Sequence, residues 1–586
     1  MEITNSSDSS KVDLAEYLFT RLHQVGIRTV HGVPGDFNLV SLDCIKPAGL
    51  HWAGNANNLN AGYAADGYAR IKGISALVTT FGVGELSAVN AMAGAYADKV
   101  PVIHIVGTPE TSAQNKGLNI RHSLGDGNFR RFALLYQQFT CAQANLADPA
   151  TAPAMIDRVI RVCMQESRPG YIELPADMAK AQVSSLGLKN NIDPSFSPNH
   201  PDTESSIFDA VFEHLDQAKM PLIIVDGFTP RYNLLSEADE LISATGWPTY
   251  VTPFGKGSVN ETHPNFHGVF TGKAAGEDDA HLNWAQKADL VIRFGPLDAD
   301  TNTYGFTTLT DRSKTIDIHR TCINIAGRVV QADTKPLLRN VLDKLDTPLY
   351  RYRYILYPHP YPYADLRGPR ERLNALTVPP APIPCPDEPL DQDHFWLWMS
   401  TFLRPHDLVI TETGPSYIGA PKGLVLPSDT VMINSALWPS VGYALGAAVG
   451  AAQAQRDLVM QHRDKPCGRT ILFTGDGNFQ MTAQAVSDIL RSRLDVIIFL
   501  VNNDGCTVER DIHGMEAGYN DIQPWNYLDA PRFFGAPVGD AGYPVVTKRV
   551  VDWGELLDVL SDDEVKAGRG LCMVEVVMGG RMRQGI

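Results

Sequence analysis

The chain has 586 residues, of which 44% are apolar and 20% are charged, a composition typical of a globular protein with several domains. Its 50 Lys and Arg residues against 66 Asp and Glu residues give a formal charge of −16. Because non-specific nucleic-acid binding needs clustered cations, we expect no nucleic-acid partner. No apolar run approaches the roughly 18 residues that a membrane helix needs, so we expect no membrane partner either.

The N-terminus and the cysteines indicate the compartment. The first residues carry neither the basic region nor the apolar core of a signal peptide, and the eight cysteines include no CxxC pair. Both features predict a cytoplasmic, reducing location without a disulfide scaffold. Residues 1–10 are polar and rich in serine, which predicts a disordered tail.

Residues 11–188 alternate short apolar runs with helical stretches. This alternation predicts a doubly wound α/β domain, in which a parallel sheet is covered by helices on both faces. Buried strands are expected at residues 76–80, 102–106 and 171–174, and crossover helices at residues 60–72 and 86–98.

Two further domains follow the first. A polar stretch at about 189–201 precedes a second α/β domain at 202–346, whose clearest strands are expected at 221–225 and 289–293. Residues 347–390 are dense in proline, which favours an extended linker over packed helix or sheet. The third domain, 391–586, has expected strands at 408–410, 470–473, 496–501 and 572–576, and its pattern looks like that of the first. The predicted fold class is therefore α/β, with three doubly wound parallel-sheet domains.

Two polar motifs follow two of the strands of the third domain. Gly475-Asp476-Gly477-Asn478 follows the run 471–474, and Asn502-Asn503-Asp504-Gly505 follows the run 496–501. Ligands of open α/β sheets bind beyond the carboxyl ends of strands, so both motifs are expected to face one bound group. Asp476 and Asn503 offer the hard oxygen ligands that Mg²⁺ prefers, and the glycines let backbone amides approach an anion. Two ordinary polar turns are the weaker alternative.

This pair of motifs resembles the thiamine diphosphate motif, and residues 12–575 are similar to the pyruvate decarboxylase family of 2-keto acid decarboxylases. The resemblance implies non-oxidative decarboxylation with thiamine diphosphate and Mg²⁺, a pyrimidine-binding first domain and a diphosphate-binding third domain. It also implies a homodimer or homotetramer, with the cofactor between the first domain of one subunit and the third domain of another. Further segments that carry the resemblance are 31–38, 52–57, 64–73, 79–88, 252–258, 412–414, 437–438 and 502–509.

The resemblance also implies roles for single residues of the third domain. The Mg²⁺ ligands would be Asp476, Asn503 and the carbonyl of Gly505, and the diphosphate would lie against Thr413, Gly477, Asn478 and Val508. The backbone carbonyl of Pro439 and the apolar side chain of Val441 would hold the cofactor in its bent shape. Plain packing at a helix entry is the other interpretation of Pro439 and Val441.

The acid–base positions that the resemblance implies are Asp36, His122 and Glu509. Such groups take on catalytic roles when they are desolvated together and their pKa values separate. Each also has an ordinary interpretation. Asp36 would be a turn residue or helix cap, His122 a loop histidine, and Glu509 a solvated helix residue.

One catalytic position departs from the family. A glutamate that shares a proton with N1′ of the aminopyrimidine follows Gly-Asn-Ala-Asn in the family, and here that position is Asn58. An amide can hydrogen-bond N1′, but it cannot exchange a proton as a carboxyl group does. The loss of a general acid–base group typically lowers a rate by about 10²–10⁴-fold.

A second departure is Arg121, which stands where the family has the first of two adjacent histidines. A guanidinium stays charged where an imidazole would titrate near neutrality. Two interpretations stay open: Arg121 clamps a substrate carboxylate or a second anionic group, or it pairs with Asp126 on its own loop.

Two functions are therefore carried forward from the sequence. The first is a decarboxylase acting on a 2-keto acid, with carboligation to an aldehyde acceptor as a possible outcome, because a site poor in proton donors protects a carbanion from protonation. The second is a paralogue that binds the cofactor but is catalytically silent, with a regulatory or assembly role.

Overall fold

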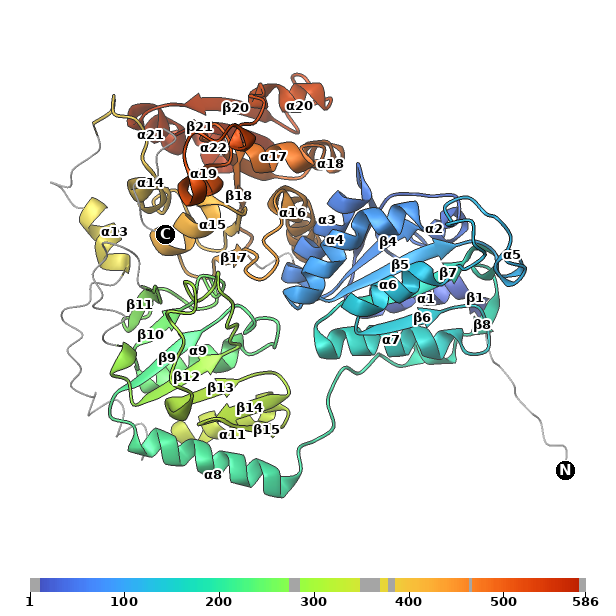
Figure 1. Ribbon diagram of the computed structural model, residues 1–586, viewed down its shortest axis with the longest axis horizontal. Helices are drawn as coiled ribbons and strands as arrows, with labels where there is room; N and C mark the ends of the chain where they lie inside the picture. Colours follow the sequence, from blue (N-terminus) through green and yellow to red (C-terminus); the bar gives the residue numbers. More distant parts are fainter. Residues whose placement is uncertain (1–10, 273–284, 348–368, 378–384, 463–465, 579–586) are drawn as a thin grey trace.

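The computed structural model describes residues 11–272, 285–347, 369–377, 385–462 and 466–578, and these form three α/β domains (Figure 1). The first domain contains a six-stranded parallel sheet in the order β3-β2-β4-β5-β7-β6. Its strands are β2 (Thr29–Gly32), β3 (His51–Gly54), β4 (Ser75–Thr80), β5 (Val102–Thr108), β6 (Ala142–Asn145) and β7 (Gly170–Pro175). Its helices are α1 (Leu14–Gln24), α2 (Leu39–Leu42), α3 (Asn58–Lys72), α4 (Val83–Ala97), α5 (Thr111–Asn115), α6 (Arg131–Tyr136) and α7 (Ala152–Glu166).

The first sheet is buried on both faces. Along β5, Ile103 and Ile105 belong to one hydrophobic core, while Val102 and Val106 belong to the core on the other face. This is why the strand is a continuous apolar run rather than an alternating one. A short antiparallel pair, β1 (Lys11–Asp13) with β8 (Gln182–Ser184), ties the start of the domain to its end.

The middle domain has a seven-stranded sheet in the order β11-β10-β9-β12-β13-β14-β15. Its last two pairings are antiparallel, so the expected parallel sheet carries an antiparallel extension at one edge. The strands are β9 (Pro221–Val225), β10 (Thr249–Val251), β11 (Phe266–Val269), β12 (Leu290–Phe294), β13 (Thr315–Ile318), β14 (Cys322–Ile325) and β15 (Arg328–Gln331). The helices are α8 (Pro201–Gln217), α9 (Leu235–Thr245) and α11 (Thr334–Leu345).

The third domain repeats the strand arrangement of the first. Its parallel sheet has the order β17-β16-β18-β19-β21-β20, so the strands of both domains, counted along each domain, lie in the same spatial order. The strands are β16 (Leu408–Thr411), β17 (Val431–Ile433), β18 (Thr470–Gly475), β19 (Val496–Asn502), β20 (Val545–Val550) and β21 (Leu571–Val577). The helices are α14 (Gln392–Met399), α15 (Pro415–Gly423), α16 (Tyr443–Gln461), α17 (Asp476–Thr482), α18 (Ala485–Ser492), α19 (Thr507–His513), α20 (Ala530–Phe533), α21 (Trp553–Ser561) and α22 (Asp563–Ala567).

Helices α3 and α16 join the first and third domains through a closely packed, partly polar interface. Gly450 lies so near α3 that a Cβ added to it would be 1.7 Å from the carbonyl oxygen of Ala64. The Tyr68 hydroxyl donates to Asp457 at 2.8 Å, and the Tyr443 hydroxyl donates to Asp66 at 2.5 Å. Small residues at the crossing therefore allow direct contact between the two helix backbones.

The expected fold class and the expected similarity of the first and third domains are confirmed, with one difference in the linker. Within the predicted linker 347–390, α13 (Pro369–Thr377) is helical, because this stretch lies between the proline clusters and contains proline only at its first position. The domain limits stay predictions, and the expected disordered tail, residues 1–10, lies outside the described residues. No helix among the described residues is long and apolar enough to cross a membrane.

Candidate active site

The carboxyl ends of β18 and β19 lie side by side, with Gly475 paired to Val501. Asp476 follows β18 directly and is only 2% exposed. One of its carboxylate oxygens accepts a hydrogen bond from the Gly477 N–H at 2.8 Å, and the other accepts one from the Gly505 N–H at 3.0 Å. The two polar motifs are thus joined across the sheet edge, as the sequence predicts. Burial raises the pKa of Asp476 above its ordinary value.

Residues with oxygen atoms suited to Mg²⁺ follow the two strands at this edge. Asn503 directly follows β19 and is buried, and Gly505 has φ +116°, a conformation that favours glycine, with its N–H against the Asp476 carboxylate. In the described part of the chain no three His, Cys, Asp or Glu side chains come together, so a metal here would rely on one carboxylate and neutral oxygens. This set fits a cation that completes its shell with phosphate and water.

The end of β16 forms the third side of the same site. The Asn478 side chain donates to the backbone carbonyl of Thr413 at 3.1 Å. Nothing lies within 4 Å of the position that a Cβ of Gly414 would take, and a Cβ on Gly477 would meet only Ile522, at 3.7 Å. Two half-buried glycines with free space around them, next to a buried carboxylate, fit a diphosphate group bridged by a cation.

Glu412 is a residue of this site to which the sequence analysis gives no role. It is fully buried and accepts hydrogen bonds from the N–H groups of Thr413 at 2.9 Å and Ala444 at 3.0 Å. Burial raises its pKa to about 7. The carboxyl group therefore links the end of β16 to the start of α16, and the signal in the sequence was an acid placed directly after an apolar strand.

The segment before α16 carries Pro439 and Val441. Val441 is 44% exposed, so packing within this chain does not account for it, and Pro439 is exposed as well. Between them, the Ser440 hydroxyl lies 2.8 Å from the Tyr63 hydroxyl and accepts from Asn90 at 2.9 Å. The side chain of Ser440 thus fixes the segment on the first domain and leaves its neighbours on the surface.

Helix α19 carries the last two candidates of the third domain. Val508 is half-buried, and Glu509 is exposed in the first turn of the helix. The neighbouring Arg510 donates to the backbone carbonyl of Asp504 at 2.7 Å and holds the helix against the second polar motif.

The first domain brings Asp36, Arg121 and His122 together. Arg121 forms an ion pair with Asp36, and its guanidinium lies 4.7 Å from the ring centroid of Phe37. The ring of His122 meets Phe37 edge-on at 6.0 Å. Of the two interpretations of Arg121, the pair with Asp126 is wrong, because Arg121 pairs with Asp36 and Asp126 is engaged by Arg131.

Two of the ordinary interpretations hold for these residues locally. Asp36 lies in a turn, but the N-cap of the following helix is Asn38 rather than Asp36. His122 is a loop residue with φ +69°, an uncommon conformation for a non-glycine residue. The backbone carbonyl oxygen of His122 lies close to Gly82: a Cβ added to Gly82 would be 2.1 Å from it.

Asn58 is the first residue of α3 and is half-buried. Its side-chain oxygen is shut off from solvent and has no hydrogen-bond partner. It lies 3.5 Å from the position that a Cβ of Gly84 would occupy. A buried acceptor without a donor costs free energy, so this atom is poised for a donor from a bound molecule.

Glu85 supports residues 82–84, which contact His122 through Gly82 and Asn58 through Gly84. The sequence analysis gives Glu85 no role. It is fully buried, accepts from the Gly82 N–H at 2.8 Å and from the Tyr171 hydroxyl at 2.8 Å, and burial raises its pKa to about 7. Its signal in the sequence was an acid in a run of small and apolar residues.

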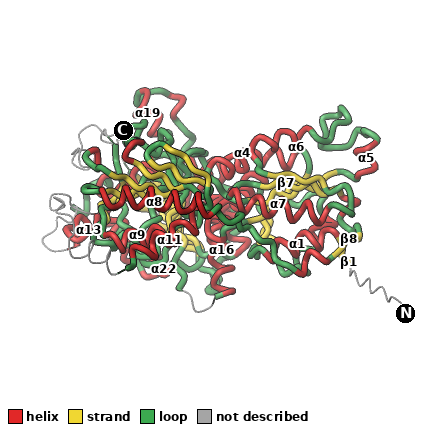
Figure 2. The backbone as a smooth tube through the Cα atoms, turned by 90° about the horizontal axis from the view of Figure 1, so that it is seen from below, coloured by secondary structure: helices red, strands yellow, loops and turns green. Residues whose placement is uncertain are grey.

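Within one chain, Arg121 and His122 of the first domain lie far from Val508 and Glu509 of the third domain. Helix α5, after which Arg121 and His122 follow, lies at one end of the molecule, whereas α19, which carries Val508 and Glu509, lies toward the other (Figures 1 and 2). Both views agree on this separation. One chain thus presents two separate half-sites, one around Arg121 and His122 and one around Val508 and Glu509.

Comparison with known proteins identifies similarity over almost the whole chain. Residues 12–127, 208–345 and 422–576 match the N-terminal TPP binding domain, the central domain and the C-terminal TPP binding domain of thiamine pyrophosphate (thiamine diphosphate) enzymes. The chain is 41% identical over 575 residues to the pyruvate decarboxylase of Aspergillus fumigatus, which covers 97% of this chain and 94% of that protein. It is 42% identical over 580 residues to the pyruvate decarboxylase of Aspergillus parasiticus, with 97% and 95% covered. It is 40% identical over 530 residues to pyruvate decarboxylase isozyme 3 of Saccharomyces cerevisiae, with 90% and 89% covered.

Proposed function

We propose that this chain, which belongs to the family of thiamine diphosphate-dependent 2-keto acid decarboxylases, is a Mg²⁺-dependent lyase that works with an unusual set of proton-transferring residues. Its family membership makes it an enzyme that uses thiamine diphosphate. The observation that carries the proposal is the side-chain oxygen of Asn58, which is enclosed without a partner where the resemblance implies a glutamate.

Residues at the three strand ends of the third domain would hold the cofactor. Asp476, Asn503 and the Gly505 carbonyl would bind Mg²⁺, and the diphosphate would lie against Thr413, Gly477, Asn478 and Val508. The exposed Val441 and the carbonyl of Pro439 would support the heterocycle. When bound, thiamine diphosphate supplies the electron sink that allows CO₂ to leave.

We further propose that the complete site forms between two copies of the chain. The half-sites of one chain lie far apart (Figures 1 and 2), and the apolar residues Leu437, Trp438, Val441 and Met481 stay 41–61% exposed beside the third-domain half-site. Mixing a His122→Ala variant with an Asp476→Asn variant tests this. Hybrid dimers contain one intact site, so mixing should restore up to a quarter of the wild-type activity after random exchange, and no recovery after proven exchange would refute a shared site.

Few of the chain's own residues at the candidate site can transfer protons. Asn58 cannot exchange a proton, and Asp36 is engaged by a permanently charged guanidinium. His122 and Glu509 remain as the titratable candidates. A site with few proton donors protonates a carbanion slowly, which gives an aldehyde acceptor time to react. We therefore propose carboligation as an outcome that competes with simple decarboxylation.

Product analysis with pyruvate tests this function directly. The purified protein, saturated with thiamine diphosphate and Mg²⁺, is incubated with pyruvate alone and with pyruvate plus benzaldehyde, and CO₂ and acyloin are quantified. We expect CO₂ in both mixtures and a larger share of acyloin with the acceptor, and Asp476→Asn serves as the matched inactive control. The absence of both products from pyruvate and longer 2-keto acids would refute the function.

A second candidate function is a paralogue that binds the cofactor without catalysing a reaction, and Asn58 is the observation that favours it. Exchange of deuterium at C2 of the bound cofactor separates the two. Exchange no faster than in free solution would establish the silent role, whereas acceleration would exclude it. A cytoplasmic location is also proposed, and imaging of a fluorescent fusion would test it.

A further inference from the structure

Lys99 lies where the first domain meets the middle domain, and it has no acidic partner there. It follows α4 and is half-buried. Its ammonium lies 5.5 Å from the ring centroid of Phe228 and 5.6 Å from that of Tyr232, two residues that follow β9 of the middle domain. Among the described residues, its side chain makes neither a hydrogen bond nor an ion pair. Two aromatic faces therefore hold this amine in the place of a carboxylate.

The charged groups around Lys99 are mostly cations. Arg168 follows α7, and Arg320 precedes β14 of the middle domain. Both guanidinium groups repel the ammonium of Lys99, whereas Glu166, the exposed last residue of α7, attracts it. Two cations against one carboxylate disfavour a further positive charge at this junction and favour a negative one.

Both guanidinium groups are held by contacts of their own. Arg168 lies over the ring of Tyr96, 4.0 Å from its centroid. Arg320 donates to the Ser167 hydroxyl at 2.8 Å, and this hydroxyl donates to the backbone carbonyl of Arg231 at 2.9 Å. Ser167 belongs to the first domain and the two arginines bonded to it belong to the middle domain, so these bonds also fix the two domains against each other.

The surroundings give Lys99 a neutral amine near physiological pH. Burial lowers its pKa to about 8, and Arg168 is the next cause. At pH 8 about half of this amine is therefore neutral and nucleophilic, against less than about 1% of a lysine in water. Burial lowers the pKa of His319 and raises the pKa values of Tyr232 and Cys322, so these other titratable neighbours add no charge at this pH.

A neutral amine among cations is suited to a reaction that turns it into an anion. The family to which this chain belongs releases CO₂ from 2-keto acids. We propose that Lys99 is a site of reversible carbamylation by CO₂. The lone pair of Nζ forms a bond to the carbon of CO₂, one electron pair of a C=O bond moves to its oxygen, and the nitrogen gives a proton to water. R–NH₂ and CO₂ thus become R–NH–COO⁻ and H⁺.

The charges favour CO₂ as the reagent over the aldehyde that decarboxylation also yields. An aldehyde condenses with an amine to an imine, which is a cation when it is protonated. Arg168 and Arg320 disfavour that cation for the same reason that they disfavour the ammonium. The carbamate is an anion, so the same two groups stabilise it. Carbamylation exchanges a repelled charge for an attracted one.

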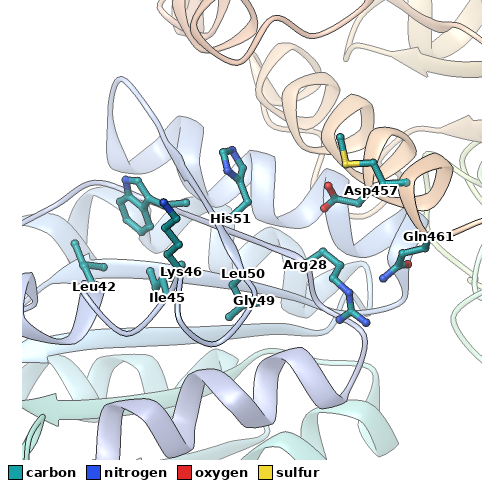
Figure 3. A pocket seen from close by; sticks show the side chains of 11 residues that line it. Arg28, Leu42, Ile45, Lys46, Gly49, Leu50, His51, Asp457 and Gln461 are labelled. Carbon is teal, nitrogen blue, oxygen red and sulfur yellow. The ribbon is translucent and has the colours of Figure 1, made fainter.

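Chemical trapping on the purified full chain tests the modification. The chain is incubated with ¹³C-labelled bicarbonate at pH 8, triethyloxonium ion converts carbamates into stable ethyl esters, and peptide mass spectrometry locates the label. Lys46 is the internal control, an exposed lysine at a pocket of about 660 Å³ between the first and third domains (Figure 3). Because carbamylation needs the neutral amine, we expect at least about tenfold more label on Lys99 than on Lys46. No label on Lys99, or equal label on both lysines, would refute the site.

Two arginine variants test the role of the surrounding charge. Arg168→Gln raises the pKa of Lys99 and also withdraws a cation from the carbamate, so the label on Lys99 should fall about three- to tenfold. Arg161→Gln, at an exposed position of α7, should leave the label unchanged. Undiminished label in folded Arg168→Gln would overturn the electrostatic argument for this site.

Nuclear magnetic resonance gives a second readout in solution. With ¹³CO₂ at a fixed pressure, a carbamate resonance separate from that of bicarbonate should appear and grow as the pH rises from 7 to 9 through the pKa of Lys99. Lys99→Arg keeps a cation over the two rings but forms no carbamate, so this resonance should be absent, and its persistence would refute the assignment. Because added CO₂ replaces turnover, a failure of the proposed catalytic function is distinguishable from a failure of this site.

Discussion

Replacement of Asn58 by glutamate tests the chemistry of the candidate active site most directly. The change introduces a carboxyl group that can exchange a proton. The gain expected from a general acid–base group is about 10²–10⁴-fold in the rate of decarboxylation, or roughly 3–5 kcal/mol of barrier.

The structure indicates that the fold tolerates this carboxyl group. Residue 58 opens α3, and a negative charge in the first turn of a helix is favourable by about 0.3–1 kcal/mol. Gly84 has no side chain next to the Asn58 oxygen, so the extra methylene meets no neighbouring Cβ. Because the enclosed carboxyl group finds no donor in this chain, we expect the free energy of unfolding to fall by about 1–3 kcal/mol, a loss that leaves the chain folded during the rate measurement.

Two measurements and one control variant test this prediction. CO₂ release from pyruvate and deuterium exchange at C2 of the bound cofactor should both accelerate in Asn58→Glu. Asn58→Gln adds the same length without an ionisable group, so it should resemble the wild type. Equal rates in Asn58→Glu and Asn58→Gln would refute the reasoning that only the proton exchange has been lost.

Three further predictions follow from the described contacts. Arg121→His should introduce an inflection near pH 6.5 in the pH–rate profile, whereas Arg131→His on the same loop should leave the profile unchanged. Because the ion pair of Arg121 with Asp36 is exposed, Arg121→His should change the free energy of unfolding by less than about 1 kcal/mol. The pKa of Glu412 is raised to about 7, so the folded chain keeps a proton that the unfolded chain loses near pH 4.5. The stability that this proton contributes is complete below pH 4.5 and is lost as the pH rises through 7. Glu412→Gln should therefore reduce the fall of thermal stability over this pH range by up to about 3 kcal/mol, whereas Glu516→Gln at an exposed position should leave it unchanged. Lys256→Met should lower the free energy of unfolding in urea by about 3–5 kcal/mol, because it leaves the buried Glu261, which Lys256 pairs with at 2.7 Å, without a counter-charge. The double variant Lys256→Met with Glu261→Leu should recover more than half of this loss.

The sequence predicted the fold well because buried parallel strands leave a strong pattern. The run 496–501 is apolar throughout, since helices cover both faces of the sheet, and β19 includes all of it. The antiparallel edge of the middle sheet was missed. Strand β15 (Arg328–Gln331) is short and largely exposed, so it carries no apolar run that could distinguish it from a loop.

The sequence predicted those contacts of the candidate site that follow from the order of strands and motifs along the chain. It did not predict contacts between segments that are distant in the sequence. The junction of Asp476 with the Gly505 N–H follows from two strand ends that share one sheet edge. The pairing of Arg121 with Asp36 depends instead on how the loop that carries Arg121 packs against the turn after β2, and the sequence carried no sign of it. Glu412 and Glu85 gain their raised pKa values from burial, and the apolar residues around each of them in the sequence do not show that the carboxyl group itself is buried.

The two positions at which we expect departures from the family, Asn58 and Arg121, lie where the fold imposes little on residue type. The start of α3 is capped by Asn57, whose side chain accepts from the Asn60 N–H at 2.8 Å, so the helix does not depend on residue 58. Arg121 is 60% exposed on a loop. Compared with a glutamate and a neutral histidine, asparagine and arginine each make the half-site one charge more positive. Both changes therefore favour the same property, the binding of anions at the expense of proton exchange, and stability did not require either of them.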